Sequence, residues 1–188
     1  MTAKNNANPG AEIKVDGTSY PDEVKRSYQE TFLTRHNLKP YKYVGCTMSL
    51  WQRLKRIVTN IGGERASVGM YVQNIVAYHL EDEDVKPLIA ELSAASCLSD
   101  TDSKAMDGIS LEAKKYQAKY LMGDMVNRKE REIYISGELG KRLKRIVLDI
   151  DGDRPTMGSY VEAILIEHLD ACADLINEMT NDSKRNTV

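Results

Sequence analysis

The sequence predicts a mostly α-helical protein in which two short strands pair as one antiparallel ribbon. The first observation behind this is an internal repeat that covers most of the 188 residues. The second is that each copy contains one strand pattern followed by two helix patterns. A lone strand leaves its backbone N–H and C=O groups unpaired, so neither copy is complete by itself. We therefore expect tandem β-α-α repeats whose strands pair with each other.

The repeat aligns without a gap from Leu50 to Leu80 and from Leu139 to Leu169, an offset of 89 residues (139 − 50). The hexapeptide RLKRIV occurs intact at 53–58 and at 142–147. The positions Gly63, Arg65, Gly69, Tyr71 and His79 return as Gly152, Arg154, Gly158, Tyr160 and His168. Upstream, Tyr28 and Phe32 are echoed by Tyr116 and Tyr120 with a shift of one residue. A match of this length indicates duplication of one structural unit.

The repeat divides the chain into five parts. Residues 27–92 and 115–180 are the two β-α-α repeats. Residues 93–114 are predicted to be a linker, because the segment from 93 to 107 is rich in small and polar residues. Polar, turn-rich composition also predicts a flexible N-terminal arm over 1–26 and a flexible tail over 181–188.

Alternating apolar and polar residues predict one strand in each repeat, over 43–47 and 132–136. Successive side chains of a strand point to opposite faces. The expected inward side chains are Val44, Cys46, Ile133 and Ile135. The expected outward positions are Tyr43, Gly45, Thr47, Glu132, Tyr134 and Ser136.

Two amphipathic helices are expected after each strand. The apolar stripe of the first helix is Leu50, Leu54, Ile57, Val58 and Ile61 in one copy and Leu139, Leu143, Ile146, Val147 and Ile150 in the other. The stripe of the second helix is Tyr71, Val72, Ile75, Val76 and Leu80, matched by Tyr160, Val161, Ile164, Leu165 and Leu169.

Turn and capping residues set the expected ends of these helices. Glycines at 62–63 and the pair at 151–152 are expected to end the first helix, and Ser67 and Thr156 to cap the second. In the first copy Pro87 is expected to begin a separate short helix. In the second copy the second helix is expected to continue through Cys172, Ala173 and Ile176.

Pairing of the two strands under four helices would satisfy both copies at once. This arrangement is the ribbon-helix-helix fold, here with both halves in one polypeptide. The segment between the repeats is long enough to allow an intramolecular pseudo-dimer, which a high effective concentration favours. A chain-swapped dimer stays open.

Three motifs carry a family resemblance: SYQETFL at 27–33, IYIS at 133–136, and the helix that runs from 159–161 to 168–169. Together they resemble a family of uncharacterised proteins encoded on conjugative transposons of anaerobic gut bacteria. Residues 44–47 match that family's strand less closely. The resemblance implies a ribbon-helix-helix fold and a role in a mobile element.

Double-stranded DNA is the partner that this fold favours, because a two-stranded ribbon fits the major groove and its outward side chains read base edges. The expected base contacts are Tyr43, Thr47, Tyr134 and Ser136. Helix N-termini and nearby cations bind phosphate. The expected phosphate contacts are Lys42, Arg65, Ser67, Val68, Arg131, Arg154, Thr156 and Met157. The predicted function is therefore a DNA-binding transcriptional regulator or accessory factor of a mobile or conjugative element.

The charge distribution leaves a second interpretation open. The net charge is −2, and the sequence pI is about 6.0, whereas DNA-binding domains are commonly basic. Basic residues do gather between 39 and 65, with Glu64 as the one acidic residue there. The alternative is a protein-interaction scaffold in a DNA-transfer complex that keeps a degenerate form of the fold. A homo-oligomer and conjugation or mobilisation proteins are further candidate partners.

Catalytic and metal chemistry are not expected. No HExxH motif, phosphate loop or glycine-rich nucleotide fingerprint occurs, so neither an enzyme nor a cofactor is predicted. His79 and His168 precede a leucine of the apolar stripe near a helix end and are expected at the edge of the core. Cys46, Cys97 and Cys172 are odd in number and far apart, as in reduced proteins. Without a membrane-length apolar run or a secretory signal, a cytoplasmic protein is expected.

Overall fold

The computed structural model describes residues 19–35, 38–63, 66–98, 109–121, 130–151 and 156–185. The described part is mostly helical, with one two-stranded sheet. The first half contains α1 (Asp22–Phe32), β1 (Tyr41–Cys46), α2 (Met48–Ile61), α3 (Val68–Glu81) and α4 (Val85–Leu98). The second half contains α5 (Leu111–Tyr120), β2 (Arg131–Ser136), α6 (Gly137–Asp151), α7 (Met157–Ala171) and α8 (Ala173–Arg185). Both halves therefore have the same order of elements.

The sheet joins the two halves, because β1 pairs with β2 in antiparallel orientation. Val44 lies opposite Ile133, which is its own repeat equivalent (44 + 89), so the register is centred on equivalent residues. Val44, Cys46, Ile133 and Ile135 are all buried. The predicted antiparallel pairing and inward face are confirmed. The strands begin slightly earlier than expected, at Tyr41 and Arg131.

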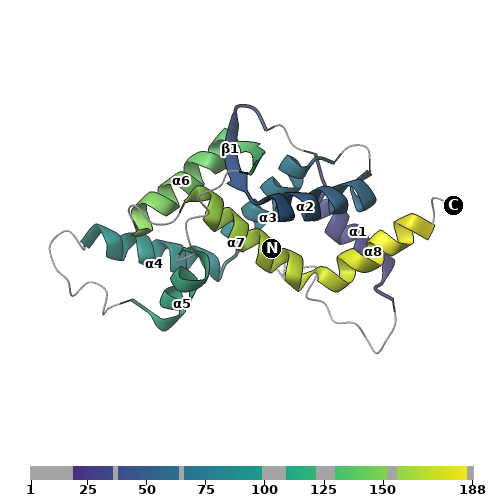
Figure 1. The fold of residues 1–188 in the computed structure, drawn as a ribbon. Helices are drawn as coiled ribbons and strands as arrows, with labels where there is room; N and C mark the ends of the chain where they lie inside the picture. Colours follow the sequence, from purple (N-terminus) through teal and green to yellow (C-terminus); the bar gives the residue numbers. More distant parts are fainter. Residues whose placement is uncertain are drawn as a thin grey trace, which may run out of the picture.

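The helices of the two halves are interleaved (Figure 1). The last helix of each half packs on the other half: α4 contacts α6, and α8 contacts α2. Helices α3 and α7 contact each other, and each also contacts the strand of the other half, α3 with β2 and α7 with β1. Each half thus supplies part of the core of its counterpart.

The core consists of aliphatic side chains and buried tyrosines and follows the predicted helical stripes. All ten predicted stripe residues of α2 and α6 are buried, and so are all ten of α3 and α7. Burying a large aliphatic side chain stabilises a fold by roughly 1.5–3 kcal/mol, so these stripes supply most of the driving force. Among the described residues, no helix combines the length and the apolar composition that crossing a membrane requires.

Helix ends follow the predicted capping residues. The Oγ of Ser67 accepts a hydrogen bond from the Met70 amide (3.3 Å), and the Oγ1 of Thr156 accepts one from the Ser159 amide (3.0 Å). Helix α2 ends at Ile61, followed by Gly62 and then by Gly63 at φ +63°. That conformation favours glycine. Helix α6 ends at 151, and the rest of the predicted stop at 152 lies outside the described residues.

Parts of the two terminal segments that were predicted to be flexible are helical. Helix α1 begins at Asp22, inside the predicted arm, and Lys25 Nζ lies 2.8 Å from Glu178 and 2.6 Å from Asp182 of α8. The same contacts hold the C-terminal segment, where α8 continues to Arg185. Composition alone predicted flexibility here. It cannot show that polar side chains pair when the partners lie more than 150 residues apart in the sequence.

The predicted linker and the last helix of each half, α4 and α8, also differ from expectation. Helix α4 runs to Leu98 and α5 begins at Leu111, so parts of the predicted linker are helical. Alanine and leucine, which are common at 94–98, favour helix. The separate helix near Pro87 is confirmed and begins at Val85. In the second half the continuous helix is wrong: α7 ends at Ala171, and α8 starts at Ala173.

Two glycines let helices α3 and α7 approach the sheet closely. A Cβ on Gly69 would overlap the carbonyl oxygen of Tyr134 in β2. A Cβ on Gly158 would lie 2.8 Å from the carbonyl oxygen of Gly45 in β1. Real Cβ atoms do not approach backbone oxygens this closely. Glycine at these equivalent positions therefore lets the start of each second helix cross the strand of the other half.

The substitutions Gly69→Ala and Gly158→Ala are expected to lower the free energy of unfolding by about 1–3 kcal/mol each, since backbone atoms must shift to admit the methyl group. Urea denaturation followed by circular dichroism measures this change. Gln52→Ala, at an exposed position of α2, is the control and should change stability by less than about 0.5 kcal/mol. Unchanged stability in both glycine variants would contradict the close approach of helix and strand.

Candidate nucleic-acid interface

The outer face of the sheet carries three exposed tyrosines. Tyr41, Tyr43 and Tyr134 are 48%, 53% and 47% exposed, so about half of each ring is accessible. The rings of Tyr43 and Tyr134 lie side by side across the strands, tilted by 59° with centroids 4.9 Å apart, and the edge-on ring of Tyr41 lies 5.7 Å from Tyr134. Tyr43 and Tyr134 lie on the outward face, as expected. Tyr41 was missed because the strand was predicted to start two residues later.

The opposite end of the same face is acidic. Gly45 pairs with the exposed Glu132, and Glu130 precedes the strand. With the repeat offset of 89 residues, Glu130 and Glu132 are the equivalents of Tyr41 and Tyr43. The outer face is therefore divided into an aromatic end and an acidic end, although its backbone comes from two similar repeats.

Thr47 and Ser136 cap helices rather than extend the outward face. Thr47 is the N-cap of α2: its Oγ1 accepts from the Leu50 amide (3.5 Å) and donates to Glu162 of α7 (2.6 Å). The equivalent Ser136 Oγ accepts from the Leu139 amide (3.2 Å) and from Gln73 of α3 (3.1 Å). Both hydroxyls are bonded to the other half as well as to a helix start, so neither stands unbonded on the outer face, and their contact with DNA bases stays a prediction.

Lys42 and Arg131 are equivalent cations at opposite ends of the ribbon. Both are exposed, and both belong to the inward-facing register at the start of their strands. The stem of Lys42 lies against Gly140 of α6. The guanidinium of Arg131 lies 5.0 Å from the ring centroid of Trp51 on α2. Each cation thus lies at the margin of the sheet against a helix of the other half, Lys42 against α6 and Arg131 against α2.

The N-termini of α3 and α7 lie beside the ribbon. Ser67 and Val68 start α3 next to β2, and Thr156 and Met157 start α7 next to β1. The first amides of a helix have no acceptor within the helix and favour anions. The predicted phosphate contacts Arg65 and Arg154 lie outside the described residues.

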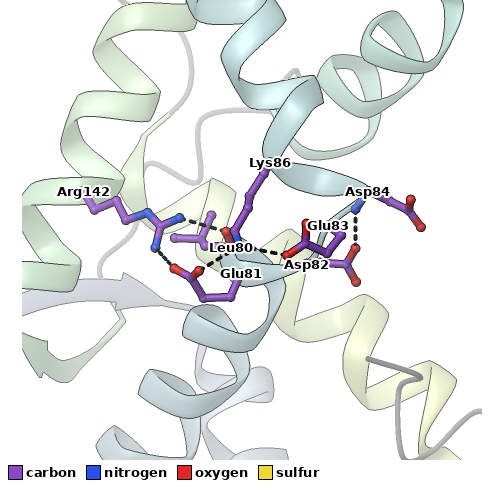
Figure 2. A network of polar contacts seen from close by, with 7 residues as sticks. All are labelled: Leu80, Glu81, Asp82, Glu83, Asp84, Lys86 and Arg142. Atoms are coloured by element: carbon purple, nitrogen blue, oxygen red, sulfur yellow. Dashed lines mark hydrogen bonds and ion pairs between the residues drawn. The ribbon is translucent and has the colours of Figure 1, made fainter. Parts of the chain in front are cut away.

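The RLKRIV motif supplies a clamp between the halves. Arg142 of α6 donates to the Leu80 carbonyl at the end of α3 (2.8 Å) and to the Glu81 carboxylate (Figure 2). The equivalent Arg53 of α2 donates to the Leu169 carbonyl (3.1 Å) and to Asp170 (2.9 Å) at the end of α7. A cation at a helix C-terminus satisfies free carbonyls and complements the helix dipole. The first arginine of the motif therefore has a structural role in both copies.

Lys86 contacts the same carboxylate as Arg142 and so adds to this clamp (Figure 2). Its Nζ lies 3.1 Å from Glu81 and 3.3 Å from Glu83. The hydrogen bonds from Arg142 and then from Lys86 hold the pKa of the Glu81 carboxyl below its ordinary value. The acidic run at 81–84 thus ends one helix and begins the next, and it lies away from the outer face of the sheet.

Two buried tyrosine–tyrosine–histidine clusters also join the halves. In one, the hydroxyl of Tyr28 lies 2.5 Å from that of Tyr71 and 3.1 Å from Nε2 of His168. The second consists of their repeat equivalents: the hydroxyl of Tyr116 lies 2.6 Å from that of Tyr160 and 2.9 Å from Nε2 of His79. In each cluster the histidine comes from the other half.

Burial sets the protonation of these clusters. It raises the pKa of each tyrosine above its ordinary value, that of Tyr160 to about 12. It lowers the pKa of His79 and of His168 from 6.5 to about 4. The histidines are therefore neutral at pH 7 and bond to a tyrosine hydroxyl. No group of three metal-ligating side chains occurs in the described ranges.

Comparison with known families gives a match to one family, which occurs at two places in the chain. Residues 5–89 and residues 99–183 each match the family described as "Protein of unknown function (DUF3408)". The chain belongs to this family. It carries two copies of the family segment in tandem, which confirms the internal repeat. No curated protein and no solved structure matches the chain.

Each of the inter-half contacts described above joins one DUF3408 segment to the other. The recurrence of Tyr28, Arg53 and Gly69 at equivalent positions is the sequence signal that could have located the clusters, the clamps and the helix–strand crossings. Recurrence alone does not say which residue each one meets. The partner comes from the other copy, and only the three-dimensional arrangement identifies it.

The free energy of unfolding is expected to fall as the pH drops from 6.5 to about 4. The unfolded histidines take up protons in that range, whereas His79 and His168 stay neutral in the folded protein until about pH 4. The expected slope is about 1 kcal/mol per pH unit for each histidine. Urea midpoints measured between pH 4.5 and 7 test it.

The double variant His79→Gln, His168→Gln is the control for this pH dependence. Glutamine keeps a neutral hydrogen-bonding group toward the tyrosine hydroxyls but does not titrate. The variant should lose most of the slope between pH 4.5 and 6.5. A slope identical to that of the natural protein would contradict burial of neutral histidines.

Proposed function

We propose that the two DUF3408 segments form one ribbon-helix-helix unit that binds double-stranded DNA through the outer face of the sheet. The observation that carries the proposal is the antiparallel pairing of β1 with β2, flanked by the N-termini of α3 and α7. A two-stranded ribbon of this kind has the width to enter the major groove.

The phosphate contacts in this proposal lie along the margins of the ribbon. Lys42 and Arg131 would reach the backbone from opposite ends of the sheet, and the first amides at Val68 and Met157 would each bind one phosphate. Arg65 and Arg154, which precede these helices in the sequence, remain candidates for the same role.

The base contacts in this proposal are aromatic. Tyr43 and Tyr134 are exposed on the outer face, and their hydroxyls can donate or accept hydrogen bonds at base edges. Thr47 and Ser136 are engaged as helix caps, which leaves sequence reading to the tyrosines. Together with the family resemblance, this supports a transcriptional regulator or an accessory DNA-binding factor of a mobile element.

One observation favours the alternative, a protein-interaction scaffold in a DNA-transfer complex. Glu132 is exposed and Glu130 lies beside it at one end of the ribbon, where carboxylates repel phosphate. A basic protein partner would suit that end. The two functions differ in how binding to DNA responds to salt.

Binding to random duplex DNA across a salt series decides between them. Neutralisation of Z phosphates releases counterions, so the logarithm of the affinity should fall against the logarithm of the salt concentration with a slope of about −0.9Z. We expect measurable binding at low salt and a steep slope. Absence of binding even at the lowest salt concentration would contradict DNA binding and favour the scaffold.

Lys42→Ala and Arg131→Ala are expected to weaken duplex binding on every sequence and to reduce the magnitude of the salt slope by about 1 each. Fluorescence anisotropy with a labelled duplex measures both effects. Lys115→Ala is the matched control, because Lys115 is exposed on α5, far from the sheet in Figure 1. An equal loss in all three variants would show that general charge, rather than the ribbon margin, determines the affinity.

A further inference from the structure

A groove opens at the aromatic end of the ribbon. It has a volume of about 670 Å³ and lies between β1, β2 and the N-terminus of α3. Tyr41 and Tyr134 form its aromatic wall, and Leu38 and Met70 contribute apolar surface. Small-ligand sites commonly have volumes of about 300–1,000 Å³, so the groove can take a group of nucleotide size.

The groove also contains positive charge. Arg35 and Lys39 line it, both with exposed side chains. Ser67, which caps α3, lies at the same place, and the amides of Val68 and Gly69 that follow it have no acceptor within the helix. The described residues that line the groove include no carboxylate. Its chemistry therefore suits an anionic ligand that carries a flat, apolar surface.

Only one end of the ribbon has this combination. The repeat equivalents of Tyr41 and Tyr134 are Glu130 and Gly45, which offer no ring. A second pocket shares Tyr134 with the groove and contains Trp51 and Arg131, but it is also lined by the carboxylates Glu130 and Glu132. The two repeats therefore share one backbone frame, but the pair Tyr41 and Tyr134 has no aromatic equivalent at the other end of the ribbon.

We propose that this groove binds single-stranded nucleic acid, with bases stacked on Tyr41 and Tyr134 and phosphates near Arg35 and Lys39. Rings that are half exposed beside a hollow can contact the face of a base, and base faces are accessible only when the strand is unstacked. A duplex offers base edges and closed stacks instead. The site goes beyond the duplex contacts proposed above and does not depend on them.

The groove lies at only one of the two ends of the ribbon, and this determines how many strands one chain should bind. One strand should bind per chain, without strong preference for base sequence, because every base has a stacking face. Affinity should fall with salt, with a shallower slope than on duplex DNA, as is usual for single strands.

The test is fluorescence anisotropy of a labelled oligothymidylate of about ten nucleotides, measured beside a duplex of random sequence. Tyr41→Ala is expected to weaken binding of the single strand about tenfold, and Tyr41→Phe, which keeps the ring, should bind within about twofold of the natural protein. Arg35→Ala should weaken binding and flatten the salt slope. Leu111→Ala, at an exposed position of α5, is the control.

Each outcome separates this site from the duplex function. Binding of the single strand that is lost in Tyr41→Ala and kept in Tyr41→Phe supports the groove, whether or not the duplex binds. No binding of the oligothymidylate at low salt overturns it and leaves duplex binding untouched. Equal affinity in the natural protein, Tyr41→Ala and Arg35→Ala also overturns it, because the strand then binds elsewhere.

Discussion

The fold depends on one constraint: the described part of each repeat has a single strand, whose backbone must find a partner outside that repeat. Pairing of β1 with β2 satisfies it. The same exchange recurs around the sheet, where Gly69 and Gly158 admit a helix onto the opposite strand and Arg53 and Arg142 close the ends of opposite helices. An unpaired buried N–H or C=O group destabilises a protein by about 1–3 kcal/mol, so several such groups left open would exceed the stability of a small domain.

The elements that depend on local pattern could be predicted from the sequence. Alternation located the strands, helical spacing located the buried stripes of α2, α3, α6 and α7, and Ser67 and Thr156 marked two helix starts. Elements held by distant polar pairs could not be predicted in this way. The start of α1 and the end of α8 depend on Lys25 meeting Glu178 and Asp182, and composition alone made both segments appear flexible.

The candidate interface shows the same division. The outward tyrosines followed from the strand period, but the register that gathers Tyr41, Tyr43 and Tyr134 at one end required the pairing itself. Thr47 and Ser136 had the pattern of outward strand residues, yet their hydroxyls cap helices and bond to the other half. The two repeats have the same order of backbone elements. Differences at a few outer positions, such as Tyr41 and Tyr43 against Glu130 and Glu132, make their surfaces chemically different. The surface of a nearly symmetric fold can therefore become chemically asymmetric while the equivalent core positions stay hydrophobic.

Pairing of the strands within one chain is tested most directly by nuclear Overhauser effects between Val44 and Ile133. In uniformly labelled protein the account predicts cross-strand contacts between these residues. In a sample that mixes labelled and unlabelled chains, an experiment filtered for contacts between molecules should show none. Absence of the contact in the first sample would contradict the sheet, and its presence in the second would show that the strand is exchanged between two chains.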